Sequence, residues 1–284
     1  PEAKITWRQV AAFLKRTQPH QLFIYQRRPK PISVFRRSRP LQLLTVDLTA
    51  LPVQTLPDKT QRKWILLAID AFSRYAWASV LEPQPPNSGP TAKLGWEAFW
   101  PILKEVKEEL NGDVTGLVIQ SDGGNEFKDR FHNELTRRKI KHYYGVPGKP
   151  ASQSMVERLN QTIKGKLKRL WRARGVLAAK PWNDSTIQAV VASYNDQVHS
   201  ALPKGVTPTD VMDAIDEDPT GLIQKVKEHQ QGIWDKKKGK YEQKWIDEGN
   251  QSKYKAGDIV RKISAQPDKY DTQWSVTLYE IAKV

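Results

Sequence analysis

Residues 117–170 constrain this chain most, because an apolar run there ends in an acid and a flexible loop then leads into an amphipathic helix. Residues 116–120 have the composition of a short buried strand, and Asp122 follows them after Ser121. Residues 145–154 are rich in Gly, Pro and Ser, which break regular structure. The stretch therefore predicts a strand, an acid, a loop and a helix in that order.

The helix after the loop begins near Met155 and carries two faces. Apolar residues recur at intervals of three or four, which predicts a stripe that packs inward. Glu157 heads a polar face about a quarter-turn away. A charged helix face is usually only solvated surface. Glu157 is therefore a candidate site residue only because further acids lie upstream in the sequence. The apolar stripe is Val156, Leu159, Ile163, Leu167 and Leu170, and the polar face is Glu157, Asn160, Gln161, Lys164 and Lys168.

A third acid, Asp47, lies inside an apolar, β-prone run at residues 43–49. A carboxylate within such a run is costly unless something pairs with it. Asp47 is therefore a candidate for the same site as Asp122 and Glu157.

The next apolar run, residues 64–81, predicts two further strands in a hairpin. Near its bend, Asp70 and Arg74 suggest a structural pair or turn, and Asp70 is also a reserve candidate for a catalytic acid. A predicted helix at residues 96–109 and a strand ending at Gln120 follow. This order of elements predicts a mixed sheet flanked by helices.

Together these motifs resemble the catalytic core of retroviral-type integrases. The resemblance implies an α/β, ribonuclease-H-like mixed-sheet core, and it is nearest to the integrases of Polinton/Maverick elements and virophages, or of gypsy-like retrotransposons. Residues 194–203 with Thr207 and Pro208 are similar to the segment that closes such cores. The motifs that carry the resemblance are residues 46–48, 70–74, 121–127 and 156–164.

The resemblance implies that Asp47, Asp122 and Glu157 are the catalytic acids and hold two Mg²⁺ ions, for which Mn²⁺ can substitute. Two-metal phosphoryl transfer uses ions roughly 4 Å apart, and magnesium prefers oxygen ligands. Three clustered acids repel one another, which raises their proton affinity until metal binds. The implied reaction trims a 3′ DNA end and joins its hydroxyl to a target strand.

The charge of the chain favours a polyanionic partner. Lys and Arg number 46 against 31 Asp and Glu, which leaves a net charge of +15. Ribosomal or merely solubilising basicity gives the same balance, so charge alone does not decide. With the resemblance, we expect double-stranded DNA, both element ends and target, bound by a homo-oligomer that forms a tetramer on DNA. The expected location is the nucleus of a host cell, or a virion or viral factory.

Composition also excludes some classes of protein. The sequence contains no cysteine, which rules out disulfides and cysteine zinc sites within these residues. It has no apolar run of about 18 residues, so we expect no membrane partner. The zinc-binding module that precedes retroviral integrase cores is missing, so we expect it upstream or expect the chain to be a fragment.

Basic residues in two regions are predicted to contact DNA. On the active-site helix, Lys164 and Lys168 share the face of Glu157, and Asn160 can reach a base or sugar. The Pro-containing segment at residues 26–40 is an extended basic linker, which is either solvated or tracks DNA through arginine. The predicted set is Asn160, Lys164, Lys168, Arg169, Arg172, Arg27, Arg28, Arg36 and Arg37.

The chain divides into four predicted parts. The core is preceded by a small helical extension and followed by a basic helical segment, which we expect to be interrupted at Gly232 and Gly239. Short β-prone runs at the end predict a small, incomplete β-barrel. The parts are residues 1–40, the extension and linker; 41–215, the core; 216–250, the basic helix; and 251–284, the barrel.

Some side chains have a structural interpretation. His142 and His199 have no second ligand at metal spacing, so both are interpreted as structural. The aromatic residues of the helix at 96–109 are interpreted as core or as a self-association face.

Two other functions stay open. The same acids suit a ribonuclease-H-type nuclease, and the fold without catalysis suits a domesticated DNA-binding protein. Asn160, Lys164 and the segment after Tyr194 favour an integrase over the nuclease, and the complete set of acids argues against the silent protein. The three differ in product: joined strands, free fragments or none.

Overall fold

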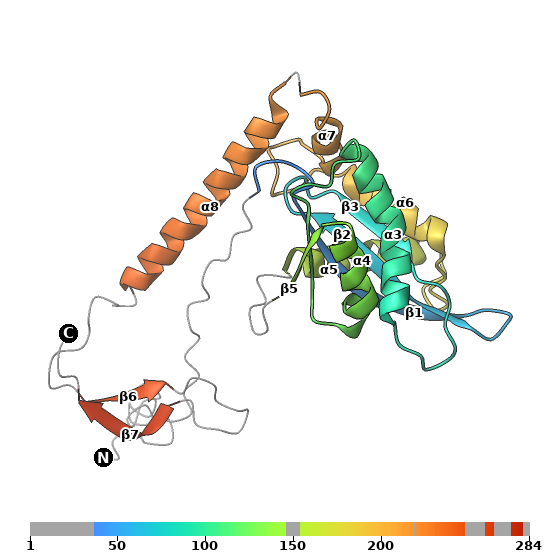
Figure 1. Cartoon of the computed structure of the whole chain (residues 1–284), viewed down its shortest axis with the longest axis horizontal. Coiled ribbons are helices and arrows are strands. Elements are labelled where there is room, and N and C mark those ends of the chain that lie inside the picture. The colour runs from blue at the N-terminus through green and yellow to red at the C-terminus, as the bar shows by residue number, and fades with distance from the viewer. Residues whose placement is uncertain (1–36, 146–153, 219, 248–258, 264–273, 281–284) are drawn as a thin grey trace, which may run out of the picture. The chain divides into compact units, whose positions relative to one another are not determined.

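The computed structural model of the protein describes residues 37–145, 154–218, 220–247, 259–263 and 274–280 (Figure 1). The chain divides into two compact units, one of Ser33–Lys236 and one of Pro1–Ile32 with Lys237–Val284. Residues 1–36 of the predicted extension at the start of the chain, including Arg27, Arg28 and Arg36, lie outside the described residues.

A five-stranded mixed sheet forms the centre of the larger unit. Its antiparallel part consists of β1 (Leu43–Thr55), β2 (Gln61–Asp70) and β3 (Ala76–Val80). On the other side of β1, β4 (Val118–Ser121) pairs parallel with it, and β5 (Lys141–Tyr144) pairs parallel with β4. The resulting order, β3-β2-β1-β4-β5, confirms the predicted mixed sheet.

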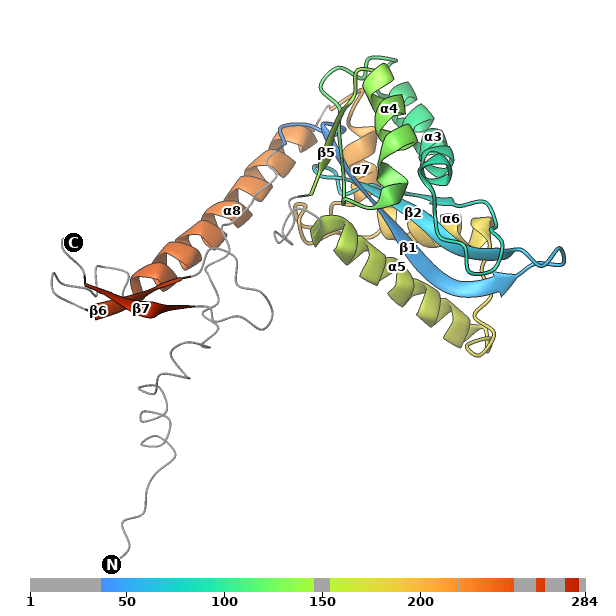
Figure 2. The same cartoon turned by 60° about the horizontal axis from the view of Figure 1, so that its bottom comes forward.

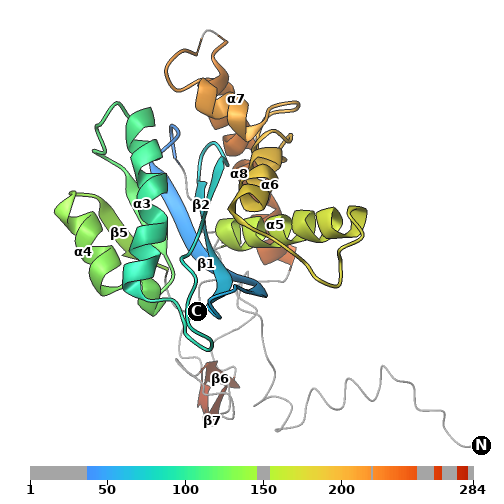
Figure 3. The ribbon, with the colours of Figure 1, turned by 90° about the vertical axis from the view of Figure 1, so that its right-hand side faces the viewer.

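Helices cover both faces of this sheet (Figure 3). On one face lie α3 (Ala92–Glu109), α4 (Asp129–Arg137) and the short 3₁₀ turn η1 (Asn125–Phe127). On the other face lie α5 (Ser154–Ala173) and α6 (Asp184–Asn195), with α5 running along β1 and β2 (Figure 2). Two helices follow, α7 (Pro208–Asp213) and α8 (Leu222–Asp247).

Two apolar layers hold these helices in place, because side chains along a strand alternate between the faces of the sheet. Leu66 of β2 packs in the layer with Phe99 of α3, whereas its neighbour Leu67 packs in the layer with Ile163 of α5. The predicted apolar stripe of α5 is buried, apart from the partly buried Leu170. A smaller cluster around Phe72 includes Val226 and so joins the first turns of α8 to the core.

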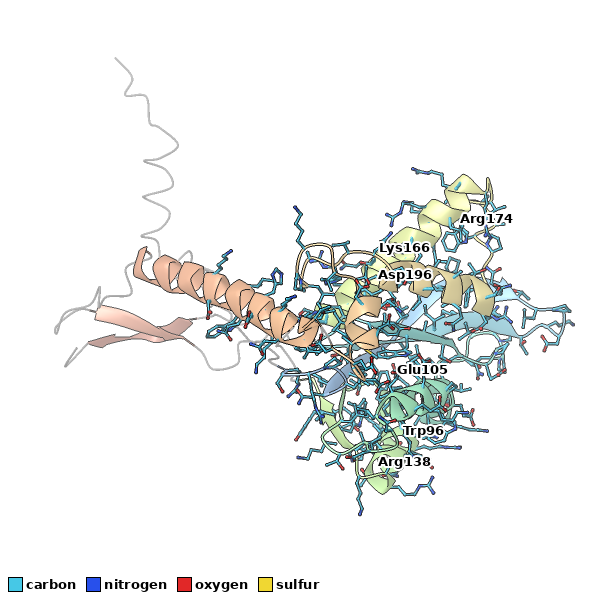
Figure 4. The ribbon with its side chains drawn as sticks, turned by 90° about the horizontal axis from the view of Figure 1, so that it is seen from above. Trp96, Glu105, Arg138, Lys166, Arg174 and Asp196 are labelled. Carbon is cyan, nitrogen blue, oxygen red and sulfur yellow. The ribbon has the colours of Figure 1, made fainter. Side chains whose placement is uncertain are left out.

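The aromatic residues of α3 form core. Trp96 and Phe99 are buried and meet Phe131 of α4, while Trp100 is half-buried under the Arg138 guanidinium (Figure 4). Of the two interpretations of this helix, the described contacts therefore support the core.

Two local expectations fail. β5 was not predicted, because its four residues include a lysine and two exposed tyrosines rather than an apolar run. The predicted interruptions at Gly232 and Gly239 are wrong, since α8 is continuous through both. A single glycine costs a helix about 1 kcal/mol relative to alanine, which weakens the helix without ending it.

In the smaller unit, β6 (Ile259–Ile263) and β7 (Trp274–Glu280) pair antiparallel. Both fall within the segment predicted to be a barrel, and the rest of that segment lies outside the described residues. The barrel therefore stays a prediction. No helix in the described part of the chain is both long and apolar enough to cross a membrane.

Candidate active site

Asp47, inside β1, and Asp122, just after the end of β4, come together where the parallel pairing of these two strands ends. The register pairs Thr45 of β1 with Gln120 of β4, and each acid lies two residues further along its strand. Because side chains alternate, both acids belong to the sheet face that α5 covers. Asp47 is half-buried and Asp122 is exposed.

Burial and the neighbouring Asp122 change the pKa of Asp47. Burial and the Asp122 charge raise the pKa of Asp47 to about 6, and Glu126 adds a smaller repulsion. A hydrogen bond from Asn160 acts in the opposite direction and lowers it. None of the ion pairs formed among the described residues includes Asp47. A cation bound here would therefore relieve an existing repulsion.

Asn160 connects α5 to the acid pair. Its Nδ2 donates to Asp47 Oδ2 at 2.5 Å, while its Oδ1 is buried without a hydrogen-bond partner. A buried polar atom left unpaired costs about 1–3 kcal/mol. The amide thus orients Asp47 and keeps one oxygen available beside it. Its predicted contact with DNA stays a prediction.

Glu157 lies one turn before Asn160 on α5 and is exposed. Within the described residues, no group of three His, Asp or Glu side chains is close enough to hold a metal ion. The structure therefore brings Asp47 and Asp122 together and places Glu157 on the helix that borders them. Residues 146–153, the predicted loop before α5, lie outside the described part. The role of Glu157 as the third acid stays a prediction.

The oxygen atoms of Asp47, Asp122 and Asn160 suit a divalent cation such as magnesium. Two carboxylates and the unpaired Asn160 Oδ1 supply only oxygen, the ligand that magnesium prefers. The repulsion that raises the pKa of Asp47 is the expected state of such ligands in the absence of a cation. The residues present therefore agree with the expected metal.

Glu126 is a neighbour of the acid pair that was not predicted as a site residue. Its side chain folds back over Gly124, where an added Cβ would lie 2.6 Å from the Glu126 carboxyl group. The Gly124 N–H in turn donates to Asp122 Oδ1 at 2.9 Å. A side chain at position 124 would displace only the flexible end of Glu126, whereas the backbone N–H of this turn orients Asp122. The acidic character of residues 121–127 was the available signal for Glu126.

A pair of histidines supports the residue before Asp122 from the α4 side of the sheet. His142 Nε2 lies 2.9 Å from Ser121 Oγ, and its Nδ1 lies 3.1 Å from His132 Nδ1. Because Ser121 Oγ–H donates to the Asp122 carbonyl, we assign the proton of His142 to Nε2 and a donating N–H to His132 Nδ1. Burial and His132 lower the pKa of His142 to about 4.

These contacts agree with the structural interpretation of His142, but His132 was missed. Only the packing of α4 against β5 brings the two rings together. His199 is also engaged locally, because its Nδ1 accepts from the Ala201 N–H and its ring contacts Tyr194. Burial lowers the pKa of His199 to about 4.

Asp70 holds the turn after β2. Its fully buried carboxylate accepts hydrogen bonds from the backbone N–H groups of Leu41, Phe72 and Ser73 and from the Ser73 hydroxyl. The turn interpretation is therefore confirmed, and these bonds leave Asp70 unsuited to the reserve role of catalytic acid. Arg74 has a left-handed backbone with φ of 65°, and its guanidinium contacts Met155 Sδ in the first turn of α5.

The basic residues predicted to contact DNA do not share one surface. Lys164 and Lys168 are exposed on the Glu157 side of α5, as expected. Arg169 instead points toward α6, and Arg172 is exposed near the end of α5. Arg37 is half-buried just before the sheet.

Known proteins were compared with the chain by sequence. No family model matches it. It is 22% identical to the transposase for transposon Tn552 of Staphylococcus aureus over 191 residues, which cover 63% of this chain and 39% of the transposase. It is 27% identical to the Gag-Pol polyprotein of Rous sarcoma virus subgroup B over 143 residues, which cover 50% of this chain and 8% of the polyprotein. The chain therefore spans less than two fifths of the length of these relatives.

Solved structures were compared by fold. The catalytic core domain of HTLV-2 integrase in complex with magnesium has a TM-score of 0.43 and 20% identity, covering 61% of this chain and 97% of that domain. A chain of the simian T-cell lymphotropic virus intasome in complex with the PP2A regulatory subunit B56 gamma has a TM-score of 0.49 and 17% identity, covering 76% and 69%. In sequence, the chain is thus similar to a transposase and to retroviral polyproteins.

Proposed function

We propose that this chain is the catalytic part of a DNA integrase, which trims a 3′ DNA end and joins its hydroxyl to a target strand. The observation that carries the proposal is the acid pair of Asp47 inside β1 and Asp122 after β4, bordered by the helix of Glu157. Sequence similarity to a transposase and to retroviral polyproteins supports it. Kinship to Polinton/Maverick or gypsy-like integrases is proposed on the motifs alone.

In this proposal Asp47, Asp122 and Glu157 would hold two magnesium ions. The bound ions would activate the attacking oxygen and stabilise the leaving oxygen. Asn160 orients Asp47 and lowers its pKa, while the Gly124 N–H orients Asp122. Phosphoryl transfer depends mainly on positioning and electrostatics, so these supporting contacts are expected to affect the rate.

We further propose double-stranded DNA as the partner. The charge of +15 and the exposed Lys164 and Lys168 beside Glu157 suit a phosphate backbone. Joining two ends to a second duplex requires two active sites held together, so we propose a multimer, a tetramer on DNA. Its place of action is the nucleus, where target DNA lies.

A joining assay tests the proposal. A labelled duplex that matches the element end is incubated with supercoiled plasmid and magnesium, using wild type, Asp122→Asn and the exposed control Asp216→Asn. We expect joined product with wild type and the control, and none with Asp122→Asn. Cleavage without joining would favour a ribonuclease-H-type nuclease. Binding without either product would favour a catalytically silent DNA-binding protein.

A further inference from the structure

A basic hollow of about 760 Å³ lies between α5 and α6. Lys166, Arg169 and Ala173, which line it, are about half a turn around α5 from Glu157. The hollow therefore belongs to a different side of the helix from the acid pair. Its lining includes Lys166 of α5 and Arg174 just after the helix, both of which are labelled in Figure 4. The other residues that line it are Leu170, Asn183, Ser185, Thr186, Ala189, Val190, Ser193 and Gln197.

The charges of the hollow are all of one sign. Lys166, Arg169 and Arg174 line it, and none of its lining residues is acidic. Lys166 is only 9% exposed, and its Nζ donates to Ser193 O at 3.1 Å and to Ser193 Oγ at 3.0 Å. Burial, followed by the nearby Arg169 charge, lowers the pKa of Lys166. An anion in the hollow would offset both effects.

The wall formed by α6 begins with a capped helix start. Asn183 precedes the helix, and its Oδ1 accepts from the Thr186 N–H at 2.9 Å and from both the Ser185 and Thr186 hydroxyls. Because this cap and Asp184 satisfy the helix start, the positive charge of the hollow comes from Lys166, Arg169 and Arg174. The acids at the two ends of α6 do not line the hollow, and Asp196 accepts instead from Thr209 Oγ1 at 2.8 Å.

We propose that this hollow binds phosphates of a DNA backbone, at a contact separate from the DNA held at the acid pair. Arginine forks and lysine ammonium groups, as supplied here by Arg169, Arg174 and Lys166, recognise phosphate oxygens without reading sequence. The inference rests on the proposed function, because a joining reaction must hold two duplexes at once. Each protomer would then hold two duplexes. The acid pair would act on one of them, and the hollow would position the other.

Binding measurements separate this site from catalysis. The double substitution Arg169→Gln with Arg174→Gln is made in an Asp122→Asn background, and the affinity for a mixed-sequence duplex is measured from low to high salt. Each lost phosphate contact lowers the slope of log affinity against log salt by about 0.9, so we expect a fall of about 2. The control, Lys104→Gln with Lys107→Gln on exposed positions of α3, removes equal charge and should leave the slope nearly unchanged.

Equal slopes in the two double variants would overturn the proposal, because the effect would then be one of overall charge. A loss of poly-glutamate binding with an unchanged DNA slope would overturn it in favour of an acidic protein segment. A change of oligomeric state in sedimentation, again without a change of slope, would overturn it in favour of contact with a second copy.

A crosslink locates the contact directly, because the chain has no native cysteine. Ser185→Cys, in the same Asp122→Asn background, places a single thiol in the wall of the hollow. We expect it to form a disulfide with duplex DNA that carries a thiol tethered to the backbone, whereas Lys107→Cys on α3 should not. Absence of the Ser185→Cys crosslink while the protein still binds the duplex would contradict the site. Failure of joining with a retained crosslink would refute only the proposed function.

Discussion

The acids carried by strands and the acid carried by a helix are held in different ways. The pairing of Thr45 with Gln120 places Asp47 and Asp122 side by side, and backbone hydrogen bonds maintain that register. Glu157 depends instead on the apolar stripe that seats α5 against β1 and β2. The strands therefore bring their acids together without a ligand, whereas Glu157 is exposed on the helix beside them.

The repulsion between Asp47 and Asp122 therefore arises from the sheet alone and does not need α5. Asp47 already carries a raised pKa through burial and Asp122, and Glu157 takes no part in that shift. The contribution of α5 to the acid pair comes through Asn160. Substitutions on the strand side should thus change the metal-free protein, while Glu157 should matter only for the reaction.

The largest expected effect is on the reaction. Glu157→Gln should lower the joining rate by about 1000-fold or more, because losing several kcal/mol of charge stabilisation corresponds to about three powers of ten. The fold and DNA binding should be unchanged, since Glu157 is exposed. Joining kinetics, circular dichroism and DNA affinity check this, with Glu108→Gln on exposed α3 as the control. A joining rate near that of wild type would remove Glu157 from the site.

The next effect concerns stability of the metal-free protein. The pKa of Asp47 rises from its ordinary 3.8 to about 6 on folding, so the folded state binds the proton more tightly. The stabilisation is complete below pH 3.8 and is lost as pH rises through 6, and it amounts to about 3 kcal/mol at most. Urea unfolding between pH 4.5 and 7.5 should show this loss in wild type.

Asp47→Asn should abolish this pH-dependent loss of stability, and it should also remove the extra stabilisation that magnesium gives wild type at pH 7. Glu157→Gln serves as the comparison and should keep the wild-type pH dependence. If Asp47→Asn and Glu157→Gln reduced the pH dependence of the unfolding free energy equally, the proposed difference between Asp47 on the strand and Glu157 on the helix would be wrong.

A smaller effect on the joining rate is expected from the hydrogen bond between Asn160 of α5 and Asp47 of β1. Asn160→Ala removes a hydrogen bond that lowers the pKa of Asp47, so that pKa should move above 6. The joining rate should fall about fivefold, in line with a net contribution of about 1 kcal/mol for one hydrogen bond. Carboxyl titration by nuclear magnetic resonance measures the first effect. The exposed neighbour Gln161→Ala should change neither quantity.

The smallest effect is expected on the solvated side of α5. Lys164→Gln and Lys168→Gln should each lower the salt slope of duplex binding by about 1, with little change in stability. Measurement of affinity at several salt concentrations checks this. A slope equal to that of wild type in both variants would show that the two lysines are only solvated surface.

Much of this organisation could be predicted from the sequence, because it follows from local pattern. The β-prone runs around Asp47 and Asp70 and the three-to-four spacing after Glu157 indicate strands and a helix without reference to other segments. β5 escaped prediction because an edge strand needs few apolar side chains. The continuity of α8 was not predicted, because isolated glycines weaken a helix without ending it.

The sequence by itself determined the mixed sheet, the amphipathic α5 and the identity of the candidate acids, since periodicity and residue type express these locally. Only the tertiary structure decided that Asp122 and Asn160 meet Asp47, that His132 supports His142, and that Lys166 and Arg169 turn away from Glu157. These contacts depend on strand register and on the packing of helices across the sheet. Such pairings join segments far apart in the chain, so no local pattern records them.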